Sequence, residues 1–364
     1  MRRFILGITL LAALIGALAL YWVTRPLPVL TVTTWPGPYG HAQRAALIEP
    51  YRDVARVNMH ANEWEGDLAE LSHAIASHTY KGDVIDFELP KAIEACRMGL
   101  LEKLDAAGLP AGIDGAPAAH DFVNGSLGEC WVASVAYSQA ILFAKGKFTG
   151  GEPATAADFF DVNRFPGPRA LKQGAKLNLE LALLADGVAP QDIYKTLETE
   201  AGVARAFQKL GTLKPGLIWW QAAGEPAKLI RSGQAVFSTV LNADIFDARA
   251  DMPGVIWDRQ LYEFDVFGVP KGNPRKGMAM EFIRYATSAR PLARMANRIA
   301  YGPARRSALP LVGDNPEFHV AMRPFLPTAP ANFATAFAVD DAWWLAHGAP
   351  LEARFAAWAA AASN

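Results

Sequence analysis

The chain has no excess of charge of either sign. Its 364 residues carry a formal net charge of −1, and its lysines and arginines do not gather into a basic cluster. Because a nucleic-acid backbone is bound by neutralising a run of phosphates, this balance argues against a nucleic-acid partner.

The short motifs of common enzymes are missing as well. The sequence contains no GxSxG, HExxH or GxGxxG motif and no Walker phosphate loop. The seven histidines do not have metal-ligand spacing; His73 and His78, for example, are five residues apart and off one helical face. We therefore expect neither catalysis nor a cofactor nor a bound metal.

Cysteine is scarce, with only Cys96 and Cys130 in the whole chain. In an oxidising compartment an isolated pair suggests one disulfide, and two buried free thiols are the alternative.

The first 24 residues differ from the rest of the chain. Arg2 and Arg3 precede an uncharged run over residues 4–24, which contains a small-x-small site at Ala17-Leu18-Ala19. This is the layout of an export signal, but the run also approaches the ~20 residues that can span a bilayer. Residues 1–24 are thus predicted to be a signal peptide or an N-terminal membrane anchor. Either one places the remaining chain outside the cytoplasm, in the periplasm.

The remaining sequence alternates between strand-like and helical segments. Residues 29–35, 56–64 and 82–88 have the composition of strands, and segments with helical spacing separate them. This order favours a parallel sheet covered on both faces. The long apolar run at 128–144 is predicted to pass from one lobe into another, and residues 254–259 and 261–270 are predicted as two further strands. The order indicates a two-lobed α/β protein with a ligand cleft beyond the carboxyl ends of the strands.

Carboxylates stand where buried strands should have almost none. In "GDVIDFELPKAIEAC", Asp86 and Glu88 share one side of a strand near its end. A buried carboxylate must be solvated, hydrogen-bonded or matched to a cation such as an ammonium group. Both acids are therefore candidates for ligand contact, although Glu88 could instead cap the following helix. Asp83, nearer the strand start, is expected to be a turn residue.

A second strand, "LYEFDVFGVP", places Asp265 between apolar residues, with Glu263 on the same face. Ligand contact and a structural ion pair are both open for Asp265. Trp35 and Tyr39 flank the glycine turn after the first strand, and aromatic faces attract ammonium groups. The pairs Trp219–Trp220 and Trp343–Trp344 are expected to be packing residues.

Several segments, in order, carry a family resemblance. They are "GDVIDFELPKAIEACRMGLLEKLD", "FFDVNRFPGPRAL", "ALLADGV", "IWWQAAGEPAKLIRSGQ", "LYEFDVFGVPKGN" and "AYGPARRSAL". Together they resemble the periplasmic solute-binding proteins of ABC importers, of the spermidine/putrescine-binding type. The resemblance implies a two-lobed Venus-flytrap fold, each lobe a mostly parallel sheet flanked by helices. Lobe 1 would comprise residues 29–133 and 262–305, and lobe 2 residues 134–261 and 306–364.

The same resemblance implies a set of ligand-binding residues. Aromatic residues of the first loop, Trp35 and Tyr39, would enclose the solute, and Tyr301 of "YGP" would join them. Asp86, Glu88 and Asp265 would hold amino groups, and Glu263 stands where polyamine binders tend to carry an aromatic residue. Glu180 falls loosely near another acidic position and is expected to be a solvated helix residue. Cys96 and Cys130 occupy positions that look paired in one branch of the family.

We thus expect a monomeric receptor for a small cationic amine such as a polyamine, which it would deliver to an ABC permease. Two alternatives stay open at this point: the same fold with a different solute, and a membrane-tethered ligand sensor. An iron-binding relative of the same fold would use a tyrosine pair, and none of the nine tyrosines is adjacent to another.

Overall fold

The computed structural model describes residue 16 and residues 26–360. The predicted signal peptide or anchor therefore lies outside the described residues, apart from residue 16. Within the described part of the chain, no helix has the length and apolar character needed to cross a membrane.

The described strands form one mixed sheet in the order β2-β1-β3-β8-β4-β7-β5-β6, with β10 paired to β8 and β9 to β4. The strands are β1 (Val29–Thr34), β2 (Asn58–Glu63), β3 (Val84–Glu88), β4 (Val132–Phe143), β5 (Arg169–Lys172), β6 (Leu217–Trp220), β7 (Phe237–Leu241), β8 (Gly254–Gly268), β9 (Gly302–Pro303) and β10 (Phe337–Ala338).

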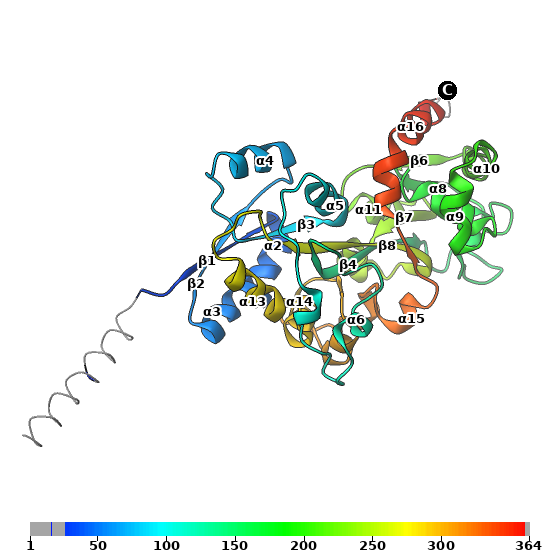
Figure 1. The fold of residues 1–364 in the computed structure, drawn as a ribbon. Coiled ribbons are helices and arrows are strands. Elements are labelled where there is room, and N and C mark those ends of the chain that lie inside the picture. Colours follow the sequence, from blue (N-terminus) through cyan, green and yellow to red (C-terminus); the bar gives the residue numbers. More distant parts are fainter. Residues whose placement is uncertain (1–15, 17–25, 361–364) are drawn as a thin grey trace, which may run out of the picture.

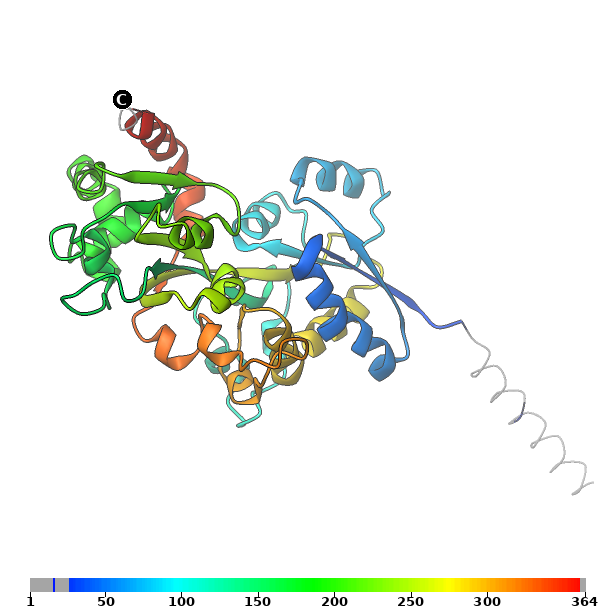
Figure 2. The same ribbon diagram turned by 180° about the vertical axis from the view of Figure 1, so that it is seen from behind.

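Helices lie on both sides of each half of the sheet (Figures 1 and 2). They are α2 (Gly37–Gln43), α3 (Glu49–Ala55), α4 (Leu68–Ala76), α5 (Leu89–Arg97), α6 (Ala118–Asp121), α7 (Ala156–Phe160), α8 (Asn178–Ala185), α9 (Ile193–Leu197), α10 (Glu200–Gly211), α11 (Glu225–Arg231), α12 (Asn242–Asp247), α13 (Lys276–Ala286), α14 (Ala289–Arg298), α15 (Pro330–Phe333) and α16 (Asp341–Ala360).

The sheet has two parallel halves joined by two long antiparallel strands. Strands β2, β1 and β3 are parallel in one half, and β7, β5 and β6 are parallel in the other. Between them, β4 and β8 pair antiparallel to each other and each pairs with one of the halves. Figure 1 shows β8 running from the blue and cyan half into the green half. We call the half with β1 to β3 lobe 1 and the half with β5 to β7 lobe 2.

Each lobe has its own hydrophobic core. One large cluster draws on buried residues between 30 and 136 and between 262 and 304, and the second on residues between 141 and 261 and between 337 and 359. The crossing strand β4 contributes Val132 to the first cluster and Ile141 to the second. The two-lobed α/β fold is therefore confirmed, while the segment limits given above for each lobe stay a prediction.

One local expectation was wrong. The predicted strands at 254–259 and 261–270 are one strand, β8, because ladder pairing to β4 continues on both sides of a bulge. Elsewhere, Thr199 accepts a hydrogen bond from the backbone of Gly202 and so begins α10 as a helix separate from α9.

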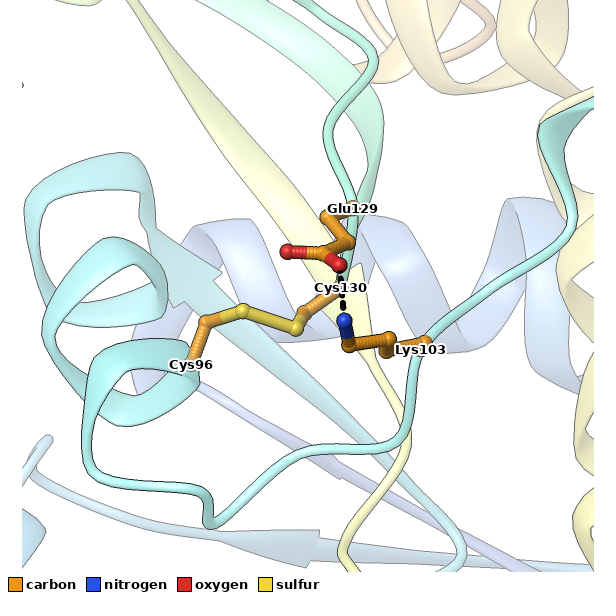
Figure 3. Close-up of a disulfide and its surroundings, with 4 residues drawn as sticks. All are labelled: Cys96, Lys103, Glu129 and Cys130. Carbon is orange, nitrogen blue, oxygen red and sulfur yellow. Dashed lines mark ion pairs between the residues drawn. A yellow bond between two sulfur atoms is a disulfide. The ribbon is translucent and has the colours of Figure 1, made fainter.

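The two cysteines form a disulfide that joins the end of α5 to the segment before β4 (Figure 3). Cys96 and Cys130 have Cα atoms 6.0 Å apart, and an ion pair between Lys103 and Glu129 lies beside them. The alternative of two free thiols is therefore wrong. The bridge fixes α5, the helix that follows the strand carrying Asp86 and Glu88.

Candidate functional site

The cleft between the lobes contains a cavity of about 390 Å³ lined from both sides. Four of the residues expected to contact a solute line it: Glu88, Glu263, Asp265 and Tyr301. Tyr39 instead lines a second cleft cavity of about 620 Å³, which also borders Tyr301. Trp35 and Asp86 line neither cavity.

Carboxylates form the lobe 1 wall of the first cavity. Glu88 ends β3, and in the antiparallel pairing of β3 with β8 it lies directly opposite Asp265. Glu263 and Asp265 share a face of β8, as their spacing predicted, and both reach the cavity. Glu88 is the N-cap residue of α5, but its side chain makes no capping hydrogen bond. Its carboxylate is therefore available to the cavity.

Burial and mutual repulsion disfavour ionisation of these acids. Burial raises the pKa of Asp265 well above its ordinary value, and the nearby carboxylates of Asp86 and Glu88 raise it further. The side chain of Glu88 is solvent-accessible, but the surrounding walls of the cleft remove part of its hydration. This loss of hydration raises the pKa of Glu88, and the nearby carboxylate of Glu263 raises it further. A cation placed between these groups would restore their ionised forms. The wall is thus suited to an ammonium group.

Asp86 is buried next to the acidic wall and does not line the cavity. Its side chain is fully buried, and neither carboxyl oxygen has a hydrogen bond of normal geometry within the described residues. Burial raises its pKa to about 8, although the polar atoms of Gln43, Tyr39 and Trp35 face it closely enough to lower the pKa in part. Asp86 is therefore expected to carry a proton at neutral pH and to support the wall from below.

The aromatic residues divide between packing and the cavities. Trp35 packs on Trp64 with ring centroids 5.7 Å apart, and Tyr39 sits in the first turn of α2, not in an open loop. Tyr39 meets Tyr301 edge to face at 5.3 Å, and Tyr301 meets Tyr137 at 6.4 Å. These three tyrosines separate and border the two cleft cavities.

Lobe 2 contributes two lysines that the sequence analysis missed. Lys172 ends β5, and Lys176 follows in the loop before α8; both line the cavity. The position of Lys172 at the carboxyl end of a strand was the signal that could have indicated it. In the described part of the chain Lys172 makes no ion pair, although its positive charge partly offsets the rise in the pKa of Glu88. We therefore consider its ammonium group the cation of the lobe 2 wall that a solute could pair with.

The ammonium group of Lys176 is paired with carboxylates of the protein itself. Its Nζ lies 2.6 Å from Asp341 Oδ1 at the start of α16 and also donates to Glu263. Burial works to lower the pKa of Lys176, but Glu263 and Asp341 outweigh it and raise that pKa overall. Asp341, far away in sequence, gave no signal that it would approach the cleft.

One further expectation was wrong. Glu180 is fully buried rather than solvated: it accepts hydrogen bonds from the Leu177 backbone and the Tyr194 hydroxyl, and from the Trp344 indole. Asp83 lies in a bend directly before β3, as expected of a turn residue, and it is also fully buried. It accepts the Thr31 amide at 2.8 Å and pairs with Arg275 at 2.8 Å. Tertiary packing thus supplies partners far away in sequence: Trp344 for Glu180 and Arg275 for Asp83.

The packing role expected for Trp220, Trp343 and Trp344 is confirmed, because all three are buried in hydrophobic clusters. Over residues 26–360, histidine, cysteine and acidic side chains form no group of three or more able to hold a metal ion.

Comparison with known proteins gives the family. A family profile described as bacterial extracellular solute-binding protein matches residues 49–324. This chain belongs to that family. The fold agrees, since an ABC transporter substrate-binding protein from Bradyrhizobium japonicum aligns with a TM-score of 0.73 at 26% identity over 91% of this chain and 99% of that one. The protein is thus an extracellular solute-binding component of ABC import.

Several similar proteins are named for the solute that they bind. The gamma-aminobutyric acid-binding protein of Pseudomonas aeruginosa is 37% identical over 333 residues, 91% of each chain. A solved GABA receptor has a TM-score of 0.73 and 28% identity over 90% of this chain and 97% of that one. PBP MotA from A. tumefaciens B6, solved with glucopine, has a TM-score of 0.68 and 26% identity over 90% of this chain and 99% of its own.

Proposed function

We propose that this solute-binding protein takes up a small zwitterion with one ammonium and one carboxylate group, of the ω-amino acid class, and delivers it to an ABC permease. The observation that carries the proposal is the charge of the two cavity walls. Carboxylates of Glu88 and Asp265 form one wall, and the ammonium of Lys172 stands on the other.

The acidic wall accounts for the ammonium end of the solute. Asp265 is 6% exposed, and its ionised form is disfavoured until a cation approaches. An ammonium group bound there would gain charge-assisted hydrogen bonds in a site with little competing water.

Lys172 accounts for the carboxylate end. A polyamine offers nothing to pair with this cation and would be repelled by it, whereas the carboxylate of an ω-amino acid matches it. In an α-amino acid the ammonium and carboxylate groups are bonded to the same carbon, so they cannot reach opposite walls of the cavity. Relatives named for gamma-aminobutyrate support the same class of solute. The spermidine/putrescine type and the monomeric state stay predictions.

The test is calorimetric titration of the domain that begins after residue 24 with γ-aminobutyrate, butylamine, butyrate, putrescine, spermidine and alanine. We expect γ-aminobutyrate to bind most tightly, because butylamine and butyrate each lack one of its charges. A concentration of ~100 times the dissociation constant should also add about 2.7 kcal/mol to the unfolding free energy. Tighter binding of putrescine or spermidine than of γ-aminobutyrate would contradict the proposal.

A further inference from the structure

We propose that Lys176 is a specificity-determining residue: it occupies the second carboxylate pair of the cleft, Glu263 and Asp341, and so restricts the site to solutes with a single ammonium group. The inference rests on the proposed function and goes beyond it, because it assigns the rejection of diamines to one side chain of the protein.

The contacts place the Lys176 ammonium where a second solute ammonium would otherwise bind. Its Nζ donates to Glu263 Oε1 and to Asp341 Oδ1, the latter at 2.6 Å. The side chains of Glu263 and Asp341 are only 8% and 1% exposed, and that of Lys176 is 26% exposed toward the cavity. A basic group from the chain itself thus fills an acidic site that opens on the solute cavity.

The loop that carries Lys176 is held in place from behind. Glu352 of α16 accepts hydrogen bonds from the backbone amides of Ala175, at 2.8 Å, and Lys176, at 3.1 Å. Asp341 belongs to the same helix, so α16 fixes both the loop and one of the carboxylates that its lysine binds. The lysine is therefore positioned by the fold and does not depend on a solute to reach Glu263.

The charges around Lys176 leave no place for a second cation. Burial and the neighbouring Glu263 raise the pKa of Asp341 to about 8, so the group of Lys176, Glu263 and protonated Asp341 is close to neutral at physiological pH. Glu352 also lines the cavity, but its carboxylate oxygens accept the backbone amides of Ala175 and Lys176, so among the described residues Glu88 and Asp265 are the lining acids without such partners. A diamine would have to displace Lys176 or leave one ammonium unpaired beside Lys172.

Removal of the Lys176 ammonium group should shift the solute preference of the cavity from γ-aminobutyrate toward putrescine. In Lys176→Met, Glu263 would face the cavity without its cation, with Asp341 buried beside it, and a diamine could bridge Glu263 and Asp265. We expect the affinity for putrescine to rise by about tenfold or more relative to γ-aminobutyrate. The measurement is the ratio of the two dissociation constants in wild type and variant, by calorimetric titration at fixed ionic strength.

Two control variants separate this effect from others. Lys172→Met removes the same charge from the same cavity but frees no carboxylate pair. Because it also removes the proposed partner of the γ-aminobutyrate carboxylate, the two variants are compared by their dissociation constants for putrescine alone. General electrostatics alone would give both variants the same gain in putrescine affinity. Lys209→Met removes a lysine of similar exposure, 23%, whose partner Asp186 is remote from the cleft, and should leave both affinities unchanged.

An unchanged preference ratio in Lys176→Met, or a gain in putrescine affinity in Lys172→Met equal to that in Lys176→Met, would overturn the inference. If wild type binds neither γ-aminobutyrate nor any other amine, the proposed function itself fails, which is a distinguishable result. Should Lys176→Met not fold, Lys176→Met with Asp341→Asn removes the cation and one buried carboxylate together. That double variant still releases Glu263 and is still expected to gain affinity for putrescine.

Discussion

Asp265 shows at the scale of a single residue how burial prepares a carboxylate for a ligand. It lies among apolar neighbours on β8, opposite Glu88, and no cation of the protein pairs with it in the described residues. The same environment that destabilises its ionised form strengthens an ammonium contact once one forms, because little water competes there. We therefore expect Asp265 to contribute little to folding and much to binding.

Asp265→Asn should weaken binding of γ-aminobutyrate by roughly 2–5 kcal/mol, as expected when one partner of a buried charge pair is lost. Calorimetric titration measures it, and Glu281→Gln, at an exposed site on α13, is the control that should bind as wild type does. An unchanged affinity in Asp265→Asn would remove this residue from the site.

Asp86 carries a prediction about pH. Its pKa is 3.8 in the reference state and about 8 in the folded protein, because the folded site is fully buried. Between these values the folded chain holds a proton that the unfolded chain releases, so the unfolding free energy falls as pH rises, by up to about 1.4 kcal/mol per pH unit.

The isosteric variant Asp86→Asn holds no such proton. It should therefore gain stability over wild type progressively between about pH 4 and about pH 8. Chemical denaturation at a series of pH values measures this difference. A difference between the two proteins that does not change with pH would contradict the raised pKa.

At the scale of elements, the disulfide and a buried ion pair tie segments of lobe 1 together. The Cys96–Cys130 bridge closes a loop of 34 residues between α5 and β4. Reduction should lower the unfolding free energy by about 2–4 kcal/mol, because the cross-link restricts the unfolded chain. Thermal unfolding with and without reductant tests this, with Cys96→Ser/Cys130→Ser as a variant that should not respond. Intact-mass data showing two free thiols would refute it.

Arg305 and Asp121 join the segment before β4 to the segment after β9. The Arg305 side chain is fully buried, with Nη1 3.0 Å from Asp121 Oδ2, and Asp121 also accepts the Ser307 amide at 2.7 Å. Arg305→Met should lower the unfolding free energy by about 3–5 kcal/mol, because it leaves Asp121 buried without its cation. Arg231→Met, at an exposed ion pair with Asp251, should change the unfolding midpoint little. Equal effects in the two variants would mean that burial of the pair does not matter.

At the scale of the whole molecule, the two cores share their longest strands. The 12 residues of β4 and the 15 residues of β8 pass through both halves of the sheet, so neither core can unfold without disrupting strands of the other. We expect one cooperative thermal transition.

Phe87→Ala, in the lobe 1 core, should accordingly lower the unfolding midpoint reported by the lobe 2 tryptophans. A large-to-small change at such a site typically costs about 3–5 kcal/mol. Differential scanning calorimetry and tryptophan fluorescence should give the same midpoint. Two separate transitions, with only one moved by Phe87→Ala, would show that the lobes unfold independently.

The sequence by itself determined the local features of this protein. Alternation along β3 and β8 placed Glu263 and Asp265 on one face, because side chains of a strand point to alternate sides. β-Branched runs, proline positions and helical spacing similarly predicted most elements of lobe 1 and the long strand β4. The acidic half of the site could be read from these patterns, since an acid within a buried strand is rare enough to be informative.

Only the tertiary structure decided which charges face each other. Lys176 and Asp341 are 165 residues apart, and nothing in either segment indicates that a helix at the C-terminus meets the loop after β5. The same holds for Glu180 with Trp344, and for Asp83 with Arg275. Pairing and burial depend on how the lobes pack, and they determine both which carboxylates stay ionised and which cations remain free. That is why the sequence alone suggested a cationic solute, whereas the position of Lys172 in the lining of the folded cleft is the basis for the zwitterion that we propose.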